Sequence, residues 1–355
     1  MILEDIVRRP SSAWMDGSGP EADIVLSSRI RLARNVDRLP FPHMMNGEAA
    51  EKLIMDVKRA VSALNGGGGW GRYEMVRMSD VAPLERQVLV EKHLISPQHS
   101  QDPTGKAVVL RDDEIVSIMV NEEDHLRIQC LFSGMQLQQA WVLASGVDDV
   151  IESVLDYAFS PERGFLTACP TNVGTGLRAS IMVHLPGLVA TNQAGKALTA
   201  IGKLGMVVRG LYGEGTEAAG NIFQISNQIT LGQTEEEIIN NLAGITGQLT
   251  DQERKARMSL VAHSREQVED RVWRSYGVLT SARILSSDEA LRLWSDVRLG
   301  VESGIIKGVS RKALNELLVL TRPGFIQRLE GREMTPFERD VKRASLIRER
   351  FREGY

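Results

Sequence analysis

The stretch of sequence that points most directly to a fold is Cys169-Pro170-Thr171-Asn172-Val173-Gly174-Thr175-Gly176-Leu177-Arg178. Three more stretches that combine arginine with serine or glutamate accompany it: Ser27-Ser28-Arg29-Ile30-Arg31, Asn121-Glu122-Glu123-Asp124-His125-Leu126-Arg127 and Arg209-Gly210-Leu211-Tyr212-Gly213-Glu214. The usual phosphate loop, Gly-x-x-x-x-Gly-Lys-Ser/Thr, is missing from the sequence. Arginine is suited to replace it, because its planar fork makes paired hydrogen bonds to phosphate and never loses its proton.

Taken in their order along the chain, the four stretches resemble the catalytic domain of the guanidino kinases, also called phosphagen kinases, over roughly residues 20 to 230. Within that superfamily the chain is most similar to the bacterial protein arginine kinases. The resemblance implies an enzyme that uses ATP and Mg²⁺ to phosphorylate a guanidinium. It also implies that five arginines converge on the phosphates of ATP and that His93 packs against the adenine. The five are Arg29, Arg31, Arg127, Arg178 and Arg209.

Taken one at a time, these residues have ordinary alternatives. A single arginine is more often part of a solvated surface ion pair. A histidine on a helix next to Leu89 and Leu94, as we expect for His93, is often a side chain at the edge of the core. Because all four motifs occur in the order found in the family, we favour the interpretation that these residues bind ATP.

Transfer to a guanidinium requires carboxylates, because a protonated arginine with a pKa of about 12.5 is not a nucleophile. A carboxylate can orient the guanidinium and accept its proton as the N–P bond forms. The resemblance gives this role to Glu123 and Glu214 and leaves open which of them takes the proton. Glu122 and Asp124 point away from Glu123 if this stretch is extended, so we interpret them as part of a solvated acidic loop.

The resemblance also places Cys169 beside the guanidinium, where nearby cations favour the thiolate and make it sensitive to oxidants. A buried, inert cysteine is the alternative, and whether Cys169 is required or only redox-sensitive stays open. Cys130 lies in the apolar run from Leu126 to Phe132, so we expect it in the core. Two cysteines are too few for a disulfide framework and suit a reducing cytosol.

Length and composition set the outline of the fold. A chain of 355 residues exceeds the size of most single cores, so we expect two domains. The net charge of −4 gives no overall attraction to nucleic acid or to anionic membranes. The N-terminus lacks the apolar core of a signal peptide, and no apolar run approaches the roughly 20 residues of a membrane span. We therefore expect a cytoplasmic protein with no nucleic-acid or membrane partner.

Hydrophobic periodicity predicts an α+β fold in which helices flank an antiparallel sheet. The expected helices cover 49–64, a segment from Pro83 and 136–159; the expected strands lie in 107–120, 126–132, 180–184, 205–212 and 221–229. After residue 232, helix starts follow one another, with capping boxes at Thr234 and Thr335 and caps at Ser287 and Ser310. We predict a catalytic domain over residues 1–252 and an all-α domain over residues 253–355.

The last predicted helix offers a second site. Arg339 and Arg343 are four residues apart and so face the same way, and Asp340 can pair with Arg343. These residues resemble the Arg-Asp-x-x-Arg-Ala element with which protein arginine kinases bind phosphoarginine. An ordinary helix face of mixed charge is the alternative.

The preferred interpretation is a protein arginine kinase. The first arginine motif begins near Arg29, so we expect the N-terminal domain that closes over free guanidino compounds to be absent. Tyr212 also stands where phosphagen kinases typically carry a second arginine. The resemblance further implies a homodimer, a zinc-binding activator protein and a Clp-type protease that removes marked proteins during stress. The alternatives are a kinase for free arginine and a non-catalytic adaptor that binds phosphoarginine; a nucleic-acid role would rest on the arginine-rich tail alone.

Overall fold

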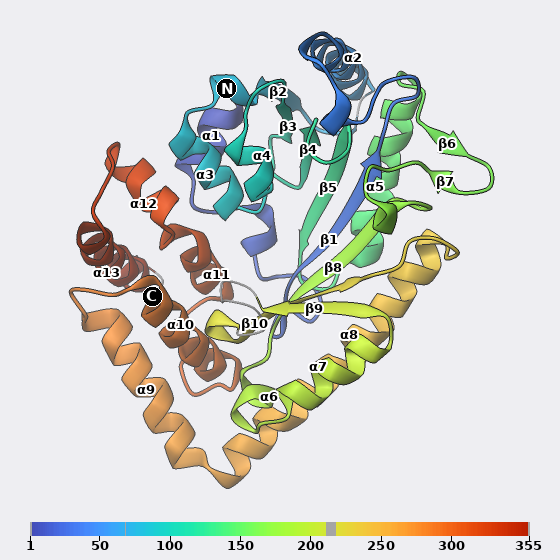
Figure 1. Ribbon diagram of the computed structural model, residues 1–355. Coiled ribbons are helices and arrows are strands. Elements are labelled where there is room, and N and C mark those ends of the chain that lie inside the picture. The colour runs from blue at the N-terminus through green and yellow to red at the C-terminus, as the bar shows by residue number, and fades with distance from the viewer. Residues whose placement is uncertain (1, 68, 211–217, 354–355) are drawn as a thin grey trace.

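The computed structural model describes residues 2–67, 69–210 and 218–353, and it centres on an antiparallel sheet of eight strands (Figure 1). The strand order across the sheet is β2-β3-β4-β5-β1-β8-β10-β9. These strands are β1 (Val25–Arg34), β2 (Tyr73–Arg77), β3 (Ala107–Arg111), β4 (Val116–Val120), β5 (Leu126–Ser133), β8 (Leu177–His184), β9 (Met206–Gly210) and β10 (Ile222–Asn227). A separate small hairpin joins β6 (Phe159–Ser160) to β7 (Gly164–Phe165).

Three helices cover one face of the sheet: α2 (Gly47–Gly66), α5 (Leu137–Glu152) and α8 (Glu235–His263). The sheet contributes alternate apolar side chains to this core, such as Ile30 of β1 and Ile128 of β5. Both of these side chains are fully buried, and they belong to the first of two hydrophobic cores.

Helices from the N-terminal and the C-terminal parts of the chain cover the opposite face of the sheet. Leu131 and Met182 on this face join a second core with α1 (Ile2–Arg8), α3 (Pro83–Glu91) and α10 (Ser287–Glu302). The other helices of the C-terminal segment are α9 (Arg265–Ser281), α11 (Arg311–Leu320), α12 (Pro323–Glu330) and α13 (Pro336–Glu353). Short helices α4 (Pro97–Gln101), α6 (Pro186–Ala190) and α7 (Ala194–Lys203) complete the regular elements used below. The C-terminal helices therefore share a core with the sheet.

The predicted α+β class is confirmed, and three details of the predicted elements were wrong. The helix expected over 136–159 ends at Glu152, and α3 ends at Glu91, so His93 lies in the turn after the helix. Ser286, next to the expected Ser287, caps α10 by accepting a hydrogen bond from the backbone N–H of Glu289. The caps at Thr234, Ser310 and Thr335 are confirmed. Helix α8 runs continuously through residue 252, where we predict the domain boundary.

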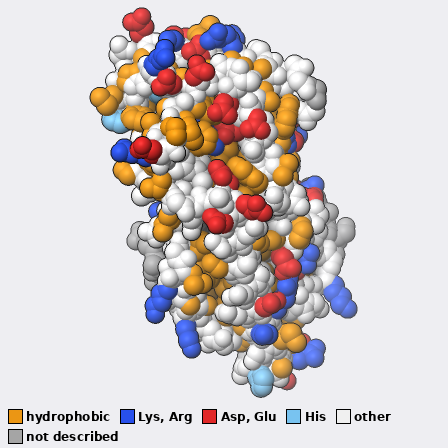
Figure 2. Space-filling view, turned by 90° about the vertical axis from the view of Figure 1, so that its right-hand side faces the viewer, with side chains coloured by type: hydrophobic (Ala, Val, Ile, Leu, Met, Phe, Trp, Pro, Cys, Tyr) orange, Lys and Arg blue, Asp and Glu red, His pale blue; other side chains and the backbone are white. Residues whose placement is uncertain are grey.

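The surface mixes both signs of charge. On the face shown in Figure 2, acidic side chains gather across the middle, and basic side chains lie mainly toward the two ends. Across the described residues, no helix has both the length and the hydrophobicity that a bilayer span requires.

Candidate active site

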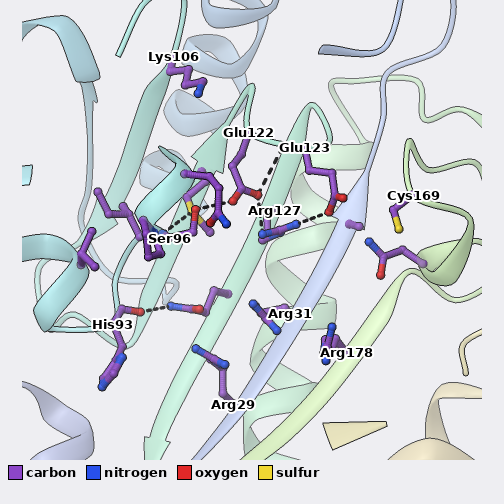
Figure 3. Close-up of a pocket in the computed structure, with 18 of the residues that line it drawn as sticks. Arg29, Arg31, His93, Ser96, Lys106, Glu122, Glu123, Arg127, Cys169 and Arg178 are labelled. Atoms are coloured by element: carbon purple, nitrogen blue, oxygen red, sulfur yellow. Dashed lines mark hydrogen bonds and ion pairs between the residues drawn. The ribbon is translucent and has the colours of Figure 1, made fainter. Parts of the chain in front are cut away.

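Three neighbouring strands bring four of the five predicted phosphate-binding arginines into one row, and Arg209 lies on β9. Successive residues of a strand point to opposite faces, so β1 sends Ile30 into the core and Arg29 and Arg31 to the other face. In the antiparallel register, Arg31 lies beside Arg178 of β8 on one side and beside β5 on the other. Arg127 of β5 pairs with the next outward position of β1. Figure 3 shows Arg29, Arg31, Arg127 and Arg178 side by side over the sheet.

Neutral side chains hold two of these arginines in place. Arg29 donates from Nε to Ser180 Oγ at 3.3 Å and from Nη2 to Gln224 Oε1 at 2.9 Å. Arg178 donates from Nη2 to Ser226 Oγ at 3.1 Å. Because these partners carry no charge, they fix the guanidinium groups without cancelling their positive charge.

The positive charges sit close enough to disfavour one another. The pKa of Arg31 is well below its ordinary value because of burial and then of the charges on Arg29, Arg127 and Arg178. The pKa of Arg178 is also lowered, first by burial and then by Arg209. Within the described part of the chain, the buried Nε atoms of Arg31 and Arg178 have no hydrogen-bond partner. Buried, positively charged donors that still have unused N–H groups are typical of a site that binds an anion.

Two carboxylates meet at Arg127. Its Nη1 lies 2.5 Å from Glu122 Oε2, and its Nη2 lies 2.8 Å from Glu123 Oε2. The Glu123 side chain is 45% exposed, whereas that of Glu122 is 5% exposed and also accepts a hydrogen bond from Ser96 Oγ. Glu123 is therefore the carboxylate with open access to the cavity.

The expectation of a solvated acidic loop was wrong for Glu122 and Asp124. Residues 121–125 form a turn, with Asn121 at a φ of 60°, so the side chains do not alternate as they would in a strand. Asp124 is fully buried and accepts hydrogen bonds at 2.7 Å from Asn35 Nδ2 and from the backbone N–H of Ala168. Asp124 thus ties this turn to the segment that leads to Cys169.

His93 lies at the other end of the arginine row. Its backbone has a φ of 63°, and its carbonyl accepts a hydrogen bond of 2.7 Å from Gln129 of β5. Its ring centroid is 5.6 Å from that of Trp14. Burial, followed by the charges of Arg29 and Arg322, lowers the pKa of His93 to about 3, so the ring is neutral at physiological pH.

The glycine-rich motif allows close approach between β8 and β1. Gly176 has a φ of 63°, and a Cβ there would lie 2.6 Å from the carbonyl oxygen of Ala33. Cys169 is half-buried at the start of this motif, with its Sγ 3.0 Å from Thr171 Oγ1. Cys130 is a core residue, as predicted, and burial raises the pKa of its thiol to about 12.

All of the predicted catalytic and ATP-binding residues in the described part of the chain line one cavity of about 890 Å³. They are Arg29, Arg31, His93, Glu123, Arg127, Cys169, Arg178 and Arg209. Glu214 and Tyr212 lie outside the described residues. The cavity also contains Ser96, Lys106, Glu122 and Arg322, which sequence reasoning did not assign to it. Ser96 carried a local signal, because a serine before a proline is typical of a helix start.

Comparison with known proteins identifies the family of this chain. Residues 53–256 match the family described as ATP:guanido phosphotransferase, C-terminal catalytic domain, and residues 265–354 match the Protein-arginine kinase McsB C-terminal domain. The chain belongs to the protein-arginine kinase family. It is an ATP-dependent phosphotransferase, as the sequence predicts.

The relatives within this family match over almost their whole length. A protein-arginine kinase of Moorella thermoacetica is 61% identical over 339 residues, which cover 96% of this chain and 97% of the relative. The protein-arginine kinase of Bacillus subtilis is 53% identical over 350 residues, which cover 99% and 96%.

Among solved structures, the similarity is more distant. The duplicated taurocyamine kinase from Schistosoma mansoni, with bound transition-state analogue components, aligns with a TM-score of 0.59 and 26% identity over 69% of this chain and 36% of that chain. Lombricine kinase aligns with a TM-score of 0.57 and 24% identity over 69% and 70%, and shares the fold.

The second predicted site of this family member lies on α13. Asp340 accepts a hydrogen bond from Arg343, as the spacing predicts. Arg343 is buried and also donates at 2.8 Å to the carbonyl oxygens of Thr321 and Leu285. Arg339 is half-buried and donates at 2.7 Å to the carbonyl oxygen of Met334. The fork of Arg343 is thus largely occupied by the C-terminal segment itself, whereas Arg339 makes a single such bond.

Proposed function

We propose that this protein transfers the γ-phosphate of ATP to arginine side chains of other proteins. The observation that carries the proposal is one cavity in which Arg31 and Arg178 lie near the accessible carboxylate of Glu123. Among the described residues, the buried Nε atoms of these two arginines have no hydrogen-bond partner. The full-length similarity to proteins named protein-arginine kinases supports this choice of acceptor.

The arginines bind and neutralise the triphosphate. Arg29, Arg31 and Arg178 carry positive charge on a partly buried surface, where an anion is attracted more strongly than in water. Charge that develops on the transferred phosphoryl group and on the departing ADP is stabilised by the same groups. Because neutral partners already hold Arg29 and Arg178, little reorganisation is needed when ATP binds.

The acceptor guanidinium is placed by a carboxylate. Glu123 presents oxygen atoms to the cavity and can hold two N–H groups of an arginine side chain in line with the γ-phosphate. The nitrogen attacks phosphorus, the bond from phosphorus to the β,γ-bridging oxygen breaks, and the nitrogen proton passes to the carboxylate. By family resemblance Glu214 and Cys169 share the acceptor side with Glu123.

Magnesium fits this site as a partner of the nucleotide. Among the described residues, no three His, Cys, Asp or Glu side chains are grouped as a metal site. Mg²⁺ is commonly held by substrate phosphates and water with few protein ligands, so the protein need not supply a cage. When bound, the ion would neutralise part of the triphosphate charge.

The cellular role extends the proposal on the basis of family resemblance. We infer a cytoplasmic enzyme, homodimeric, that marks proteins for a Clp-type protease during stress and responds to a zinc-binding activator protein. Arg339, Asp340 and Arg343 would bind phosphoarginine. The hydrogen bond between Arg343 and Asp340 is compatible with this role.

The test is a competition between acceptors. The full chain is incubated with Mg²⁺, ATP, an unfolded arginine-rich protein and free arginine, and acid-labile phosphate is located by mass spectrometry at mild pH. Phosphate on protein arginines is the expected result, and the Arg178→Gln variant should lose it. Phosphate chiefly on free arginine would favour the small-molecule kinase. Binding of phosphoarginine without any phosphate transfer would favour the adaptor.

A further inference from the structure

One cation of the cavity comes from the C-terminal helices. Arg322 and Pro323 line the same cavity as the arginine row. Arg322 is the half-buried residue that precedes α12, and its backbone is extended, with φ −78° and ψ 149°. A residue before proline is restricted to this conformation, and proline is favoured in the first turn of a helix. The local sequence therefore fixes the direction in which the chain enters α12.

A buried carboxylate locks the start of α12 against α3. Glu91 of α3 accepts hydrogen bonds of 2.8 Å from the backbone N–H groups of Gly324 and Phe325. Gly324 permits this contact, because a Cβ there would lie 2.5 Å from Gln87 Cγ. Gln87 and Glu91 themselves line the cavity. Arg322 thus starts from a rigid junction between the two halves of the chain.

Arg322 lies at the end of the cavity that contains His93, because Glu91, two residues before His93, accepts a hydrogen bond from Gly324, two residues after Arg322. After burial and the charge of Arg29, the positive charge of Arg322 also lowers the pKa of His93. Burial raises the pKa of Glu91, and the charge of Arg322 opposes this shift. Since His93 is neutral, Arg29 and Arg322 supply positive charge at this end. Glu123 and Cys169 lie toward the opposite end (Figure 3). Arg322 and the two residues proposed to act on the acceptor guanidinium therefore lie toward opposite ends of the cavity.

We propose that Arg322 contacts ATP and donates hydrogen bonds to its adenosine half. This inference rests on the proposed function, because it needs ATP in the cavity with the adenine at His93. An arginine fork offers five N–H donors and can also lie flat on an aromatic ring, and both properties suit a nucleoside. The C-terminal helices thereby become part of the nucleotide site.

The experiment separates the two halves of the nucleotide. ATP and inorganic tripolyphosphate are titrated by calorimetry into the full-length wild type, Arg322→Gln and Arg178→Gln. Loss of a charged hydrogen-bonding partner should weaken ATP binding to Arg322→Gln about tenfold or more. The same variant should bind tripolyphosphate like the wild type. Arg178→Gln should lose affinity for both compounds.

Arg328→Gln is the matched control. Arg328 also lies on α12, with its Nη2 3.4 Å from Glu85 of α3, but it lines a different groove. Its loss should leave ATP affinity unchanged. Arg322→Lys keeps the positive charge and should lose less ATP affinity than Arg322→Gln. This second variant also tests whether a weak result for Arg322→Gln comes from a folding defect.

Three results would overturn the inference. Wild-type ATP affinity in both Arg322→Gln and Arg322→Lys would show that Arg322 makes no contact with the nucleotide. An equal loss of ATP and tripolyphosphate affinity would place Arg322 on the phosphates instead of the adenosine. Failure of the wild type itself to bind ATP would refute the proposed function and, with it, this inference.

Discussion

Arg127 lies between the arginine row and the accessible carboxylate of the cavity, because its guanidinium pairs with both Glu122 and Glu123. The two carboxylates differ in their surroundings. Glu122 is enclosed and bonded to Ser96, so its charge is committed to orienting Arg127. Glu123 remains accessible from the cavity. From this difference we propose that Glu122 positions Arg127 and that Glu123 accepts the proton.

Substitution with glutamine tests that assignment. Glu123→Gln should lower the turnover number by about 10²- to 10⁴-fold, because the proton acceptor is lost, and should change ATP affinity by no more than about twofold. Glu122→Gln keeps hydrogen-bonding atoms near Ser96 and Arg127, so turnover should fall less than about tenfold. A coupled assay of ADP release and calorimetric titration of ATP measure the two quantities. An equal loss of turnover in the two variants would contradict this division of roles between Glu122 and Glu123.

Helix α13 combines a structural and a proposed binding role. Arg343 satisfies two backbone carbonyl groups at helix ends, Thr321 after α11 and Leu285 before α10. Thr321 immediately precedes Arg322, so α13 also supports the junction that reaches the cavity. Arg339 makes one hydrogen bond to Met334 and is more accessible.

Substitution of each arginine with alanine should separate these roles. Arg343→Ala should lower the free energy of unfolding by about 3 kcal/mol, because buried carbonyl groups lose their donor. Arg339→Ala should cost less than about 1 kcal/mol and weaken phosphoarginine binding about tenfold. Urea denaturation and calorimetry with free phosphoarginine provide the measurements. Arg332→Ala, which removes an exposed pair with Glu338, is the control and should change neither quantity. Unchanged phosphoarginine affinity in Arg339→Ala would make α13 a purely structural helix.

Elements with strong local signals were predictable from the sequence. The capping box at Thr234 forms both of its hydrogen bonds and starts α8 where expected. The cap of α10 differs by one residue, because Ser286 and Ser287 are adjacent and either side chain suits the position. Strand β1 was not predicted as a strand, since Arg29 and Arg31 interrupt its apolar residues.

In the candidate site, too, some residues were predictable from the sequence and others were not. Arg178 and Cys169 belong to a recognisable motif, and the structure brings both to the cavity. Arg322 carries no such signal, because its place depends on the docking of α12 on Glu91, more than 200 residues earlier in the chain. Glu122 was assigned to solvent because the alternation of a strand does not apply to the turn that contains it. Long-range packing and turn geometry account for what the sequence could not show.

The two halves of the chain are joined by more than a linker. Helix α8 is continuous through residue 252, and α10 shares the second core with α1, α3 and one face of the sheet. Glu91 and Gly324 connect the halves again beside the cavity. We therefore expect the proposed nucleotide site and the C-terminal helices to lose their structure together when the protein unfolds.

Acid should weaken this shared structure through its buried histidines. Burial lowers the pKa of His93 to about 3 and that of His99 to about 4, and it also lowers the pKa values of His125 and His184. In the unfolded chain each histidine has a pKa of about 6.5, so the unfolded state binds more protons below that pH. Stability from these groups is complete above about pH 6.5 and is lost as the pH falls toward 4.

A single histidine can be isolated in this pH dependence. At pH 5.5 an unfolded His99 is mostly protonated and a folded His99 is not, so unfolding takes up about 0.9 proton at this site. His99→Gln keeps a donor for the carbonyl oxygen of Ala107 and should reduce the slope of unfolding free energy against pH by about 1.2 kcal/mol per pH unit. His43→Gln, at an exposed position, should leave that slope unchanged. Denaturant unfolding of the three proteins between pH 5 and 7 measures the slopes, and equal slopes for wild type and His99→Gln would show that His99 takes up no proton on unfolding.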